Sequence, residues 1–202
     1  MRTRPREAAD AVPGVSAFGG AYNVPMGLFA YRLLGAAIMD AGMYEGIEAD
    51  RRTTSQAMAA VVLASVAAGI GAGDWLGTRV ETLVAVTALA VVTWSAWAML
   101  VFQIGTNVLP EPDTQADWGQ LLRTTGFAAA PGLLLVFGLI PNGRGAVFVV
   151  VGAWMFAAMV FGVKHALDYR HALRALVVCA LAAALSLALA FAASALFARR
   201  LE

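Results

Sequence analysis

Five long apolar stretches with no charged residue in their interiors constrain this chain more than any other feature. A helix needs about 20 apolar residues to cross a hydrocarbon core of ~30 Å. Other backbone conformations would leave unpaired N–H and C=O groups in lipid. The composition agrees, with 60% hydrophobic and 13% charged residues, whereas soluble domains average about 45–50% apolar and about 25% charged. We predict an all-α polytopic integral membrane protein whose partner is the lipid bilayer.

The predicted spans form a five-helix transmembrane bundle and cover residues 55–73, 82–104, 124–140, 146–163 and 172–198. Thr53 and Gln56 have the spacing of a capping box before the first span. The third span is short and carries Pro131 near its middle, which makes this proline a candidate hinge or a plain packing feature. Residues 141–145 are too short for anything but a tight turn between the third and fourth spans.

The chain before the first span divides into two parts. Residues 1–22 are rich in Arg, Ala, Gly and Pro and are predicted to be a disordered tail. Residues 23–50 are predicted to form an amphipathic helical region, with a first helix around Phe29 and Leu33 and a second one capped by Asp40. This region either lies in the membrane interface or packs under the bundle. Residues 51–202 form the five-span domain.

The basic residues favour a cytoplasmic N-terminus, because cytoplasmic loops carry an excess of Lys and Arg. With that orientation only Arg79, Arg144, Arg199 and Arg200 of the 14 basic residues lie outside. We therefore predict a multi-pass protein of a prokaryotic inner membrane. The net charge of +1 gives no basic excess for nucleic acid.

No set of residues in the sequence predicts catalysis, so we expect a protein that is not an enzyme and has no cofactor. The spans lack charged residues in their interiors, which excludes the proton relay of a coupled transporter. Ser65, Ser95, Ser186 and Ser194 have no activating base within the spans and are predicted to pack between helices or to bond back to their own helices. The polar cluster at residues 164–171 could be a solvated turn, a headgroup or partner contact, or a metal site, although further metal ligands are missing.

The five-span topology places the polar segments on one side of the membrane, where they form a candidate interaction face. Its residues are Phe29, Leu33, Tyr44, Glu111, Trp118, Lys164, His165, Asp168, Arg170 and His171.

A second pattern consists of alanines at every fourth position of the fifth span, which would let helix backbones approach closely. The stripe of Ala180, Ala184, Ala188 and Ala192 serves packing within the chain or self-association, or follows from the Ala-rich composition. Trp94, Trp97 and Trp154 lie in mid-span and are predicted to be bundle core, with contact to a pigment or quinone as the alternative.

Two parts of the chain resemble the Yip-domain family of membrane proteins, in its prokaryotic branch. The first is Arg32-Leu-Leu with Asp40 and Tyr44-Glu-Gly-Ile-Glu-Ala-Asp50-Arg, and the second is Trp118-Gly-Gln-Leu-Leu-Arg123-Thr-Thr-Gly126 up to Pro131. The resemblance implies a five-span protein with a cytoplasmic N-terminus. It does not extend to the Rab-type GTPase recruitment of eukaryotic members, because their Asp-Leu-Tyr-Gly-Pro stretch is missing here.

The leading hypothesis is therefore a non-enzymatic scaffold, adaptor or membrane organiser that acts through its cytoplasmic face. It would bind a protein partner or form a homo-oligomer. One alternative is a small transporter or channel for uncharged or lipidic substrates, gated near Pro131 and the glycine-rich end of the first span. Another is an accessory subunit of a larger membrane complex.

Overall fold

The computed structural model describes residues 24–72, 80–111 and 117–198, and these residues form helices and no strand. The predicted tail at residues 1–22 lies outside the described residues. The helices are α1 (Val24–Ala37), α2 (Ala41–Ala49), η2 (Arg51–Thr53), α3 (Thr54–Ala72), α4 (Val80–Gln103), η4 (Ile104–Val108), α5 (Trp118–Phe127), η5 (Ala130–Leu139), α6 (Arg144–Ala166) and α7 (Ala172–Ala198).

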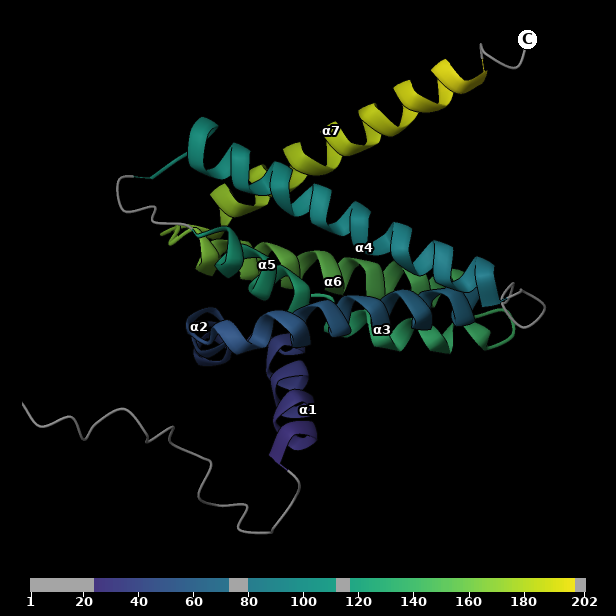
Figure 1. Ribbon diagram of the computed structural model, residues 1–202, viewed down its shortest axis with the longest axis horizontal. Coiled ribbons are helices and arrows are strands. Elements are labelled where there is room, and N and C mark those ends of the chain that lie inside the picture. The colour runs from purple at the N-terminus through teal and green to yellow at the C-terminus, as the bar shows by residue number, and fades with distance from the viewer. Residues whose placement is uncertain (1–23, 73–79, 112–116, 199–202) are drawn as a thin grey trace, which may run out of the picture.

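Five helical segments of the described chain are long and apolar enough to cross a membrane, as the sequence predicted. They are Arg51–Ala72, Thr87–Val108, Trp118–Leu139, Arg144–Ala166 and Ala172–Leu189. The chain is therefore a multi-pass membrane protein built as a helical bundle. Figure 1 shows α3, α4 and α6 running in similar directions, while the C-terminal part of α7 stands away from the other helices.

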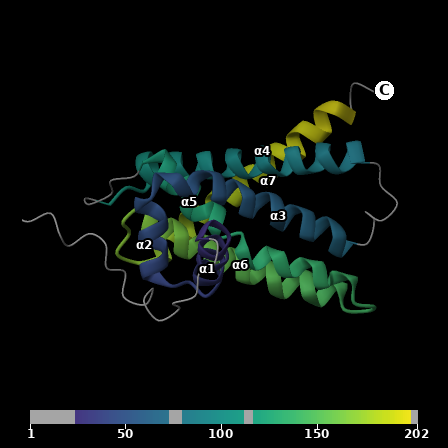
Figure 2. The same cartoon turned by 60° about the horizontal axis from the view of Figure 1, so that its bottom comes forward.

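The N-terminal helices have the predicted boundary between them. Asp40 is the N-cap of α2, and its Oδ1 accepts a hydrogen bond of 2.7 Å from the Met43 amide. Figures 1 and 2 show α1 lying across the direction of the long helices. A helix in this orientation would lie roughly in the plane of a membrane that the long helices cross.

The predicted capping box before the first span is wrong, because Asp50 takes the capping role. Its carboxylate accepts from the Arg52 amide at 2.9 Å and caps η2. Thr53 is fully buried inside η2, with its hydroxyl 2.8 Å from the Asp50 carbonyl oxygen. Gln56 instead accepts a hydrogen bond from Arg32.

The third span begins at Trp118 and not at residue 124, because α5 and η5 together make one membrane-length segment. Its second half is a 3₁₀-helix of 10 residues, which is long for this conformation. The sequence explains it: Gly132, Leu135 and Gly138 are buried at intervals of three, which is the 3₁₀ period. A rise of about 2.0 Å per residue also lets few residues cover more depth than an α-helix would.

Glycines bring the third span into backbone contact with α3. A Cβ on Gly71 would overlap the Leu135 carbonyl oxygen, and one on Gly138 would lie 2.7 Å from the Gly71 carbonyl oxygen. A Cβ on Gly126 would lie 2.7 Å from the Ala57 Cβ. The third span is thus the packed centre of the bundle.

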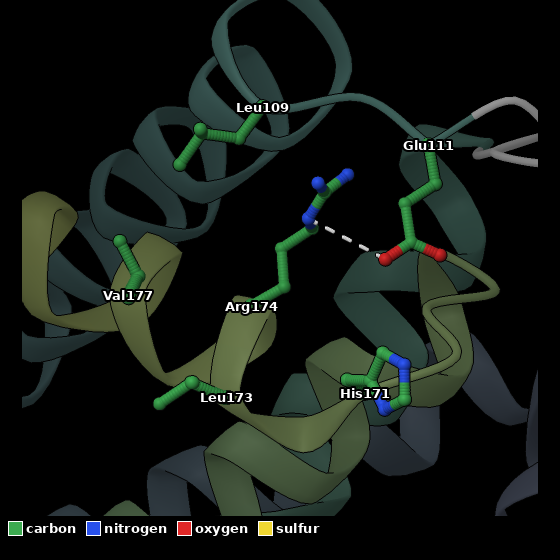
Figure 3. A pocket seen from close by; sticks show the side chains of 6 residues that line it. All are labelled: Leu109, Glu111, His171, Leu173, Arg174 and Val177. Atoms are coloured by element: carbon green, nitrogen blue, oxygen red, sulfur yellow. Dashed lines mark ion pairs between the residues drawn. The ribbon is translucent and has the colours of Figure 1, made fainter.

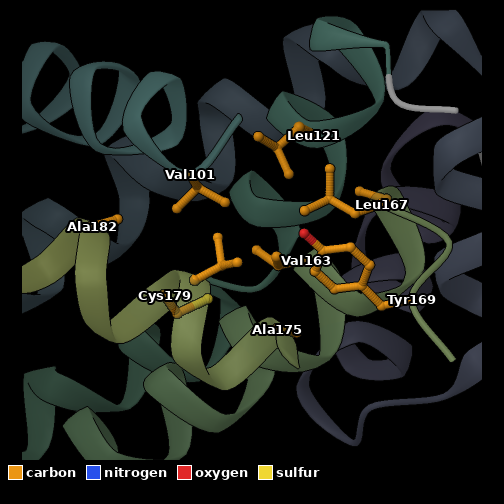
Figure 4. Packing of buried hydrophobic residues seen from close by; sticks show 10 residues of the cluster. Val101, Leu121, Val163, Leu167, Tyr169, Ala175, Cys179 and Ala182 are labelled. Atoms are coloured by element: carbon orange, nitrogen blue, oxygen red, sulfur yellow. The ribbon is translucent and has the colours of Figure 1, made fainter. Parts of the chain in front are cut away.

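The largest buried cluster lies where α4, α5, α6 and α7 meet (Figure 4). Val101, Leu121, Val163 and Val178 are all fully buried there. Cys179 is also buried and pairs with no other cysteine, since it is the one cysteine of the chain. This cluster fixes the N-terminal half of α7 against the bundle, and with it the turn between α6 and α7.

Candidate functional site

The polar segments that the sequence placed on one side of the membrane lie together at one end of the bundle. We call this the polar end; it comprises α2 with its N-cap Asp40 and the η2 turn that follows it, the connector at residues 109–111, the N-terminus of α5 and the α6–α7 turn at residues 167–171 (Figure 1). The turn between η5 and α6 lies at the opposite end. Three sets of polar contacts connect the segments of the polar end.

The first set centres on Arg123, a buried cation that precedes the predicted start of the third span by one residue. Its side chain extends from α5 to α2, where Nη2 and Nε donate to the Glu48 carbonyl oxygen at 2.6 and 3.2 Å. Arg123 is only 4% exposed, so these bonds form away from water. Partial burial of Glu48 and its neighbour Asp168 raise the pKa of the Glu48 carboxyl, although the Arg123 charge opposes this.

The second set attaches α1 to the start of the first span. Arg32 pairs with Asp50 at 2.8 Å and donates to the Gln56 Oε1 at 2.9 Å. Burial of Asp50 raises the pKa of its carboxyl, but the bonds from the Arg52 amide and Arg32 outweigh burial and lower the pKa overall. Arg32 is the one charged residue of α1, and it points to the polar end.

The third set ties the α6–α7 turn to the connector. The Tyr169 hydroxyl lies 3.0 and 2.9 Å from the Gly105 and Leu109 carbonyl oxygens and donates to one of them at a time. Burial raises the pKa of Tyr169 to about 12. Arg174 pairs with Glu111 at 3.4 Å and donates to the Pro110 carbonyl oxygen. The Arg170 amide also donates to Glu111, at 3.1 Å.

Beside this third set lies an open groove of about 530 Å³ at the N-terminus of α7. Figure 3 shows the Arg174–Glu111 pair on one side of it and His171 on another. Leu109, Leu173 and Val177 provide its apolar walls. The basic groups of the groove are thus partly neutralised by Glu111.

Three residues of the predicted interaction face are partly or fully packed inside the bundle. Tyr44 is fully buried, with its hydroxyl 3.3 Å from the Ala36 carbonyl oxygen. Its ring stacks on the His165 ring, with the two ring centroids 6.1 Å apart. Phe29 and Leu33 are half-buried against the cluster around Tyr44 and Phe127. The prediction that Tyr44 belongs to an exposed face is therefore wrong, because aromatic packing takes α2 into the bundle.

The other predicted residues vary in exposure. Trp118 packs edge-on against Phe102 with ring centroids 5.8 Å apart, and Lys164 is half-buried. Asp168, Arg170 and His171 are exposed on the turn. The exposed polar surface of the polar end is thus a mixture of both charges, and it consists of Asp40, Glu45, Arg51, Arg52, Asp117, Asp168, Arg170 and His171.

The predicted alanine stripe does not pack against the rest of the described chain. Ala180, Ala184 and Ala188 are exposed, and the side chain of Ala192 lies outside the described residues. The packed side of α7 is formed by Ala175, Val178, Cys179 and Ala182 instead. The prediction that this stripe packs within the chain is therefore wrong. Alanine is so frequent in α7 that a four-residue repeat of it also occurs on the outer side of the helix.

Nucleophile candidates within the spans are occupied by their own helices, as predicted. The hydroxyls of Ser65, Ser95 and Ser186 each donate to the carbonyl oxygen four residues earlier, at 2.8 Å. The side chain of Ser194 lies outside the described residues. Within the described ranges no three His, Cys, Asp or Glu residues are placed to hold a metal ion.

The proline and the tryptophans that lie in the middle of the spans differ in burial and in their contacts. Pro131 is fully buried at the start of η5, and Trp154 donates from Nε1 to the Ala37 carbonyl oxygen at 2.8 Å. Trp94 is 8% exposed and belongs to a buried cluster with Val61 and Ala129, while Trp97 is half-buried. Trp94 is bundle core, as predicted.

Compared with protein-family models, with curated proteins and with solved structures, the chain matches none of them.

Proposed function

We propose that this chain is a non-enzymatic membrane protein of the Yip-domain type, which acts as a scaffold or adaptor through its polar end. The observation that carries the proposal is the construction of that end. Segments distant in sequence are joined in pairs by buried or half-buried polar contacts: Arg123 joins α5 to α2, Arg32 joins α1 to the end of α2, and Tyr169 joins the α6–α7 turn to the connector. A rigid surface that exposes both charges is suited to specific recognition of a protein.

The polar end faces the cytoplasm of a prokaryotic inner membrane in this proposal. Arg51, Arg52 and Arg170 are exposed there, whereas Arg144 lies at the opposite end of α6. This distribution has the sign of the positive-inside rule.

The alternatives receive different support. A gate at Pro131 and the glycine-rich end of the first span would need space there, yet Gly71 and Gly138 are in backbone contact. An accessory subunit would need an apolar docking face, and Met26, Tyr31 and Leu34 of α1, with Ile38 just after it, are exposed by 55–81%. Lipid would cover the same residues, so we retain the accessory role as the second candidate.

The proposal is tested by purifying the tagged protein from its native membranes in mild detergent and quantifying the proteins that accompany it. Glu45→Lys with Gly46→Trp alters the exposed side of α2, where a Cβ on Gly46 meets nothing within 4 Å. The substitution adds positive charge on the proposed cytoplasmic side, so it does not oppose the proposed orientation. Arg144→Glu at the opposite end is the matched control, because it is exposed and changes charge by a similar amount.

We expect a stoichiometric partner with the wild type and the control, and its loss with the α2 variant. A wild-type protein that purifies alone as a monomer would contradict the adaptor role. Equal recovery of the partner with the α2 variant would move the interface elsewhere and favour the accessory role.

A further inference from the structure

Helix α1 projects sideways from the bundle and has an apolar side that no described residue covers. Figures 1 and 2 show it lying across the direction of the long helices. Met26 and Leu34 of α1, and Ile38 directly after it, are exposed by 67–81%. A Cβ on Gly27 would meet nothing within 4 Å. What surrounds this side depends on the depth at which the spans hold α1.

Contacts with two spans set that depth. The Phe29 ring packs edge-on against Phe127 with ring centroids 6.1 Å apart; Phe127 ends α5, about 13 Å from the start of the third span. Near the other end of α1, Trp154 donates to the Ala37 carbonyl oxygen, and Trp154 is about 18 Å from the polar end of α6. Helix α6 is about 35 Å long and crosses a core of ~30 Å, so both contacts lie within the acyl-chain region.

Charged residues limit the depth on the side of the polar end. Arg32 reaches back to pair with Asp50 at 2.8 Å, and Asp40 is exposed at the start of α2. Because charge is costly in the hydrocarbon core, these groups keep α1 in the outer part of one leaflet. At about 100° per residue, Leu34 lies about 160° around the helix from Arg32. The exposed Leu34 side chain therefore faces away from the polar end, toward the membrane centre.

The C-terminus of α1 is closed by donors from the protein alone. The last four carbonyl groups of a helix lack partners within it, and in lipid each of them needs a protein donor. The amides of residues 38–40 donate to the carbonyl oxygens of residues 34–36 at 3.0–3.1 Å. The fourth carbonyl, that of Ala37, accepts from the Trp154 indole at 2.8 Å. Water would satisfy this group on a solvated helix, so a donor built into a span suits a water-free location.

We infer that lipid acyl chains of one leaflet, the leaflet on the side of the polar end, cover the apolar side of α1. This side continues the lipid-facing surface of the spans to which α1 is joined. The helix is thus a membrane-embedded element that does not cross the bilayer. The inference goes beyond the adaptor role and does not depend on it, because it concerns a different surface of the chain.

The inference is tested by spin labelling of the full-length protein, reconstituted in vesicles of phosphatidylcholine and phosphatidylglycerol. A nitroxide is attached at Met26→Cys or Leu34→Cys, and its collision rates with oxygen and with a water-soluble nickel chelate are measured. Native Cys179 is buried, and the unmodified chain gives its background. Arg52→Cys is the water reference, because Arg52 is exposed at the polar end, and Val150→Cys is the lipid reference, because Val150 is exposed on α6.

We expect the ratio of oxygen to nickel collisions at positions 26 and 34 to resemble that at position 150. It should exceed the ratio at position 52 by about tenfold, because water and its solutes are excluded from the core. Ratios equal to that at position 52 would place α1 in water and overturn the inference. Immobile nitroxides that neither reagent reaches would also overturn it, because a second copy of the chain would then cover α1.

Discussion

The third and the fifth spans are both apolar, yet they have opposite roles in the bundle. In the most apolar 18-residue stretch of the third span, 72% of the residues are buried inside the protein, against 22% in the corresponding stretch of α7. The third span carries Gly126, Gly132 and Gly138 on its packed side, whereas the packed side of α7 consists of Ala175, Val178, Cys179 and Ala182. The third span is also the less apolar of the two, with a mean hydropathy of 1.4 against 2.3. High hydropathy therefore does not make a span central, because lipid and protein are similarly apolar. Close approach of backbones places the third span at the centre.

The largest loss of stability is expected from a substitution where the third span contacts α3. Gly71→Ala places a methyl group against the Leu135 carbonyl oxygen, and such overpacking should cost about 3 kcal/mol or more. Thermal unfolding in detergent measures the loss. Gly152→Ala is the control, because its Cβ would meet nothing within 4 Å; it should gain about 0.5–1 kcal/mol through helix propensity. Equal stability of the two variants would contradict a close α3–η5 contact.

The next largest loss of stability is expected at the start of the third span, at the polar end. Arg123→Ala removes both hydrogen bonds to the Glu48 carbonyl oxygen and leaves that oxygen unpaired, which should cost about 2 kcal/mol. Arg52 is exposed, so Arg52→Ala should change stability by less than about 0.5 kcal/mol. Chemical unfolding of both variants by denaturant checks this difference. A loss no greater than that of Arg52→Ala would mean that Arg123 does not hold α2.

Two sides of α7 should respond differently to the same substitution. Ala182 is fully buried, so Ala182→Leu should destabilise the protein by about 1–2 kcal/mol. Ala184 is exposed on the opposite side, and Ala184→Leu should stay within about 0.5 kcal/mol of wild type. Unfolding temperatures in the same detergent give the comparison. If both substitutions are equally costly, α7 packs on both sides, for example against a second copy of the chain.

The smallest expected change in stability depends on pH and on Glu48, the residue whose backbone carbonyl oxygen accepts from Arg123 of the third span. Its pKa is raised in the fold, so the neutral form stabilises the protein below the unfolded pKa, and this contribution is lost as pH rises through the folded pKa. Glu48→Gln should therefore be more stable than wild type at pH 7, by about 0.5 kcal/mol, and the gain should vanish below pH ~4. Glu45→Gln on the exposed side of α2 is the control. A stability gain that does not change with pH would have another cause.

The sequence predicted the parts of the fold that local chemistry determines. Apolar length located five spans, and Asp40 marked the start of α2 by its capping oxygen. The start of the third span was missed because the charge of Arg123 interrupts the apolar run directly before residue 124. Arg123 is buried here, as are Thr124 and Thr125, whose hydroxyls donate to carbonyl oxygens of their own helix. Such compensation depends on contacts that the sequence does not show.

The candidate site was predictable only as a location. Topology brought residues 44, 111, 118 and 164–171 to one end, but which of them face outward depended on packing. Tyr44 enters the bundle because Gly162 leaves space beside its ring, with a Cβ there only 3.0 Å from the Tyr44 Cε1. A groove between α4, α6 and α7, with Trp97 and Phe156 on its walls, is formed by helices that are separate in sequence, so periodicity within any one of them gives no sign of it.

The central claim is that α2 and the α6–α7 turn share one side of the membrane, while the η5–α6 turn lies on the other. Single cysteines at Glu45, His171 and Arg144, treated in intact cells with a membrane-impermeant maleimide, test it most directly; native Cys179 is buried and should stay unlabelled. We predict labelling at position 144 alone, with positions 45 and 171 reacting only after the membrane is opened. Labelling of 45 and 171 from opposite sides, or of 144 from the same side as both, would contradict the five-span account.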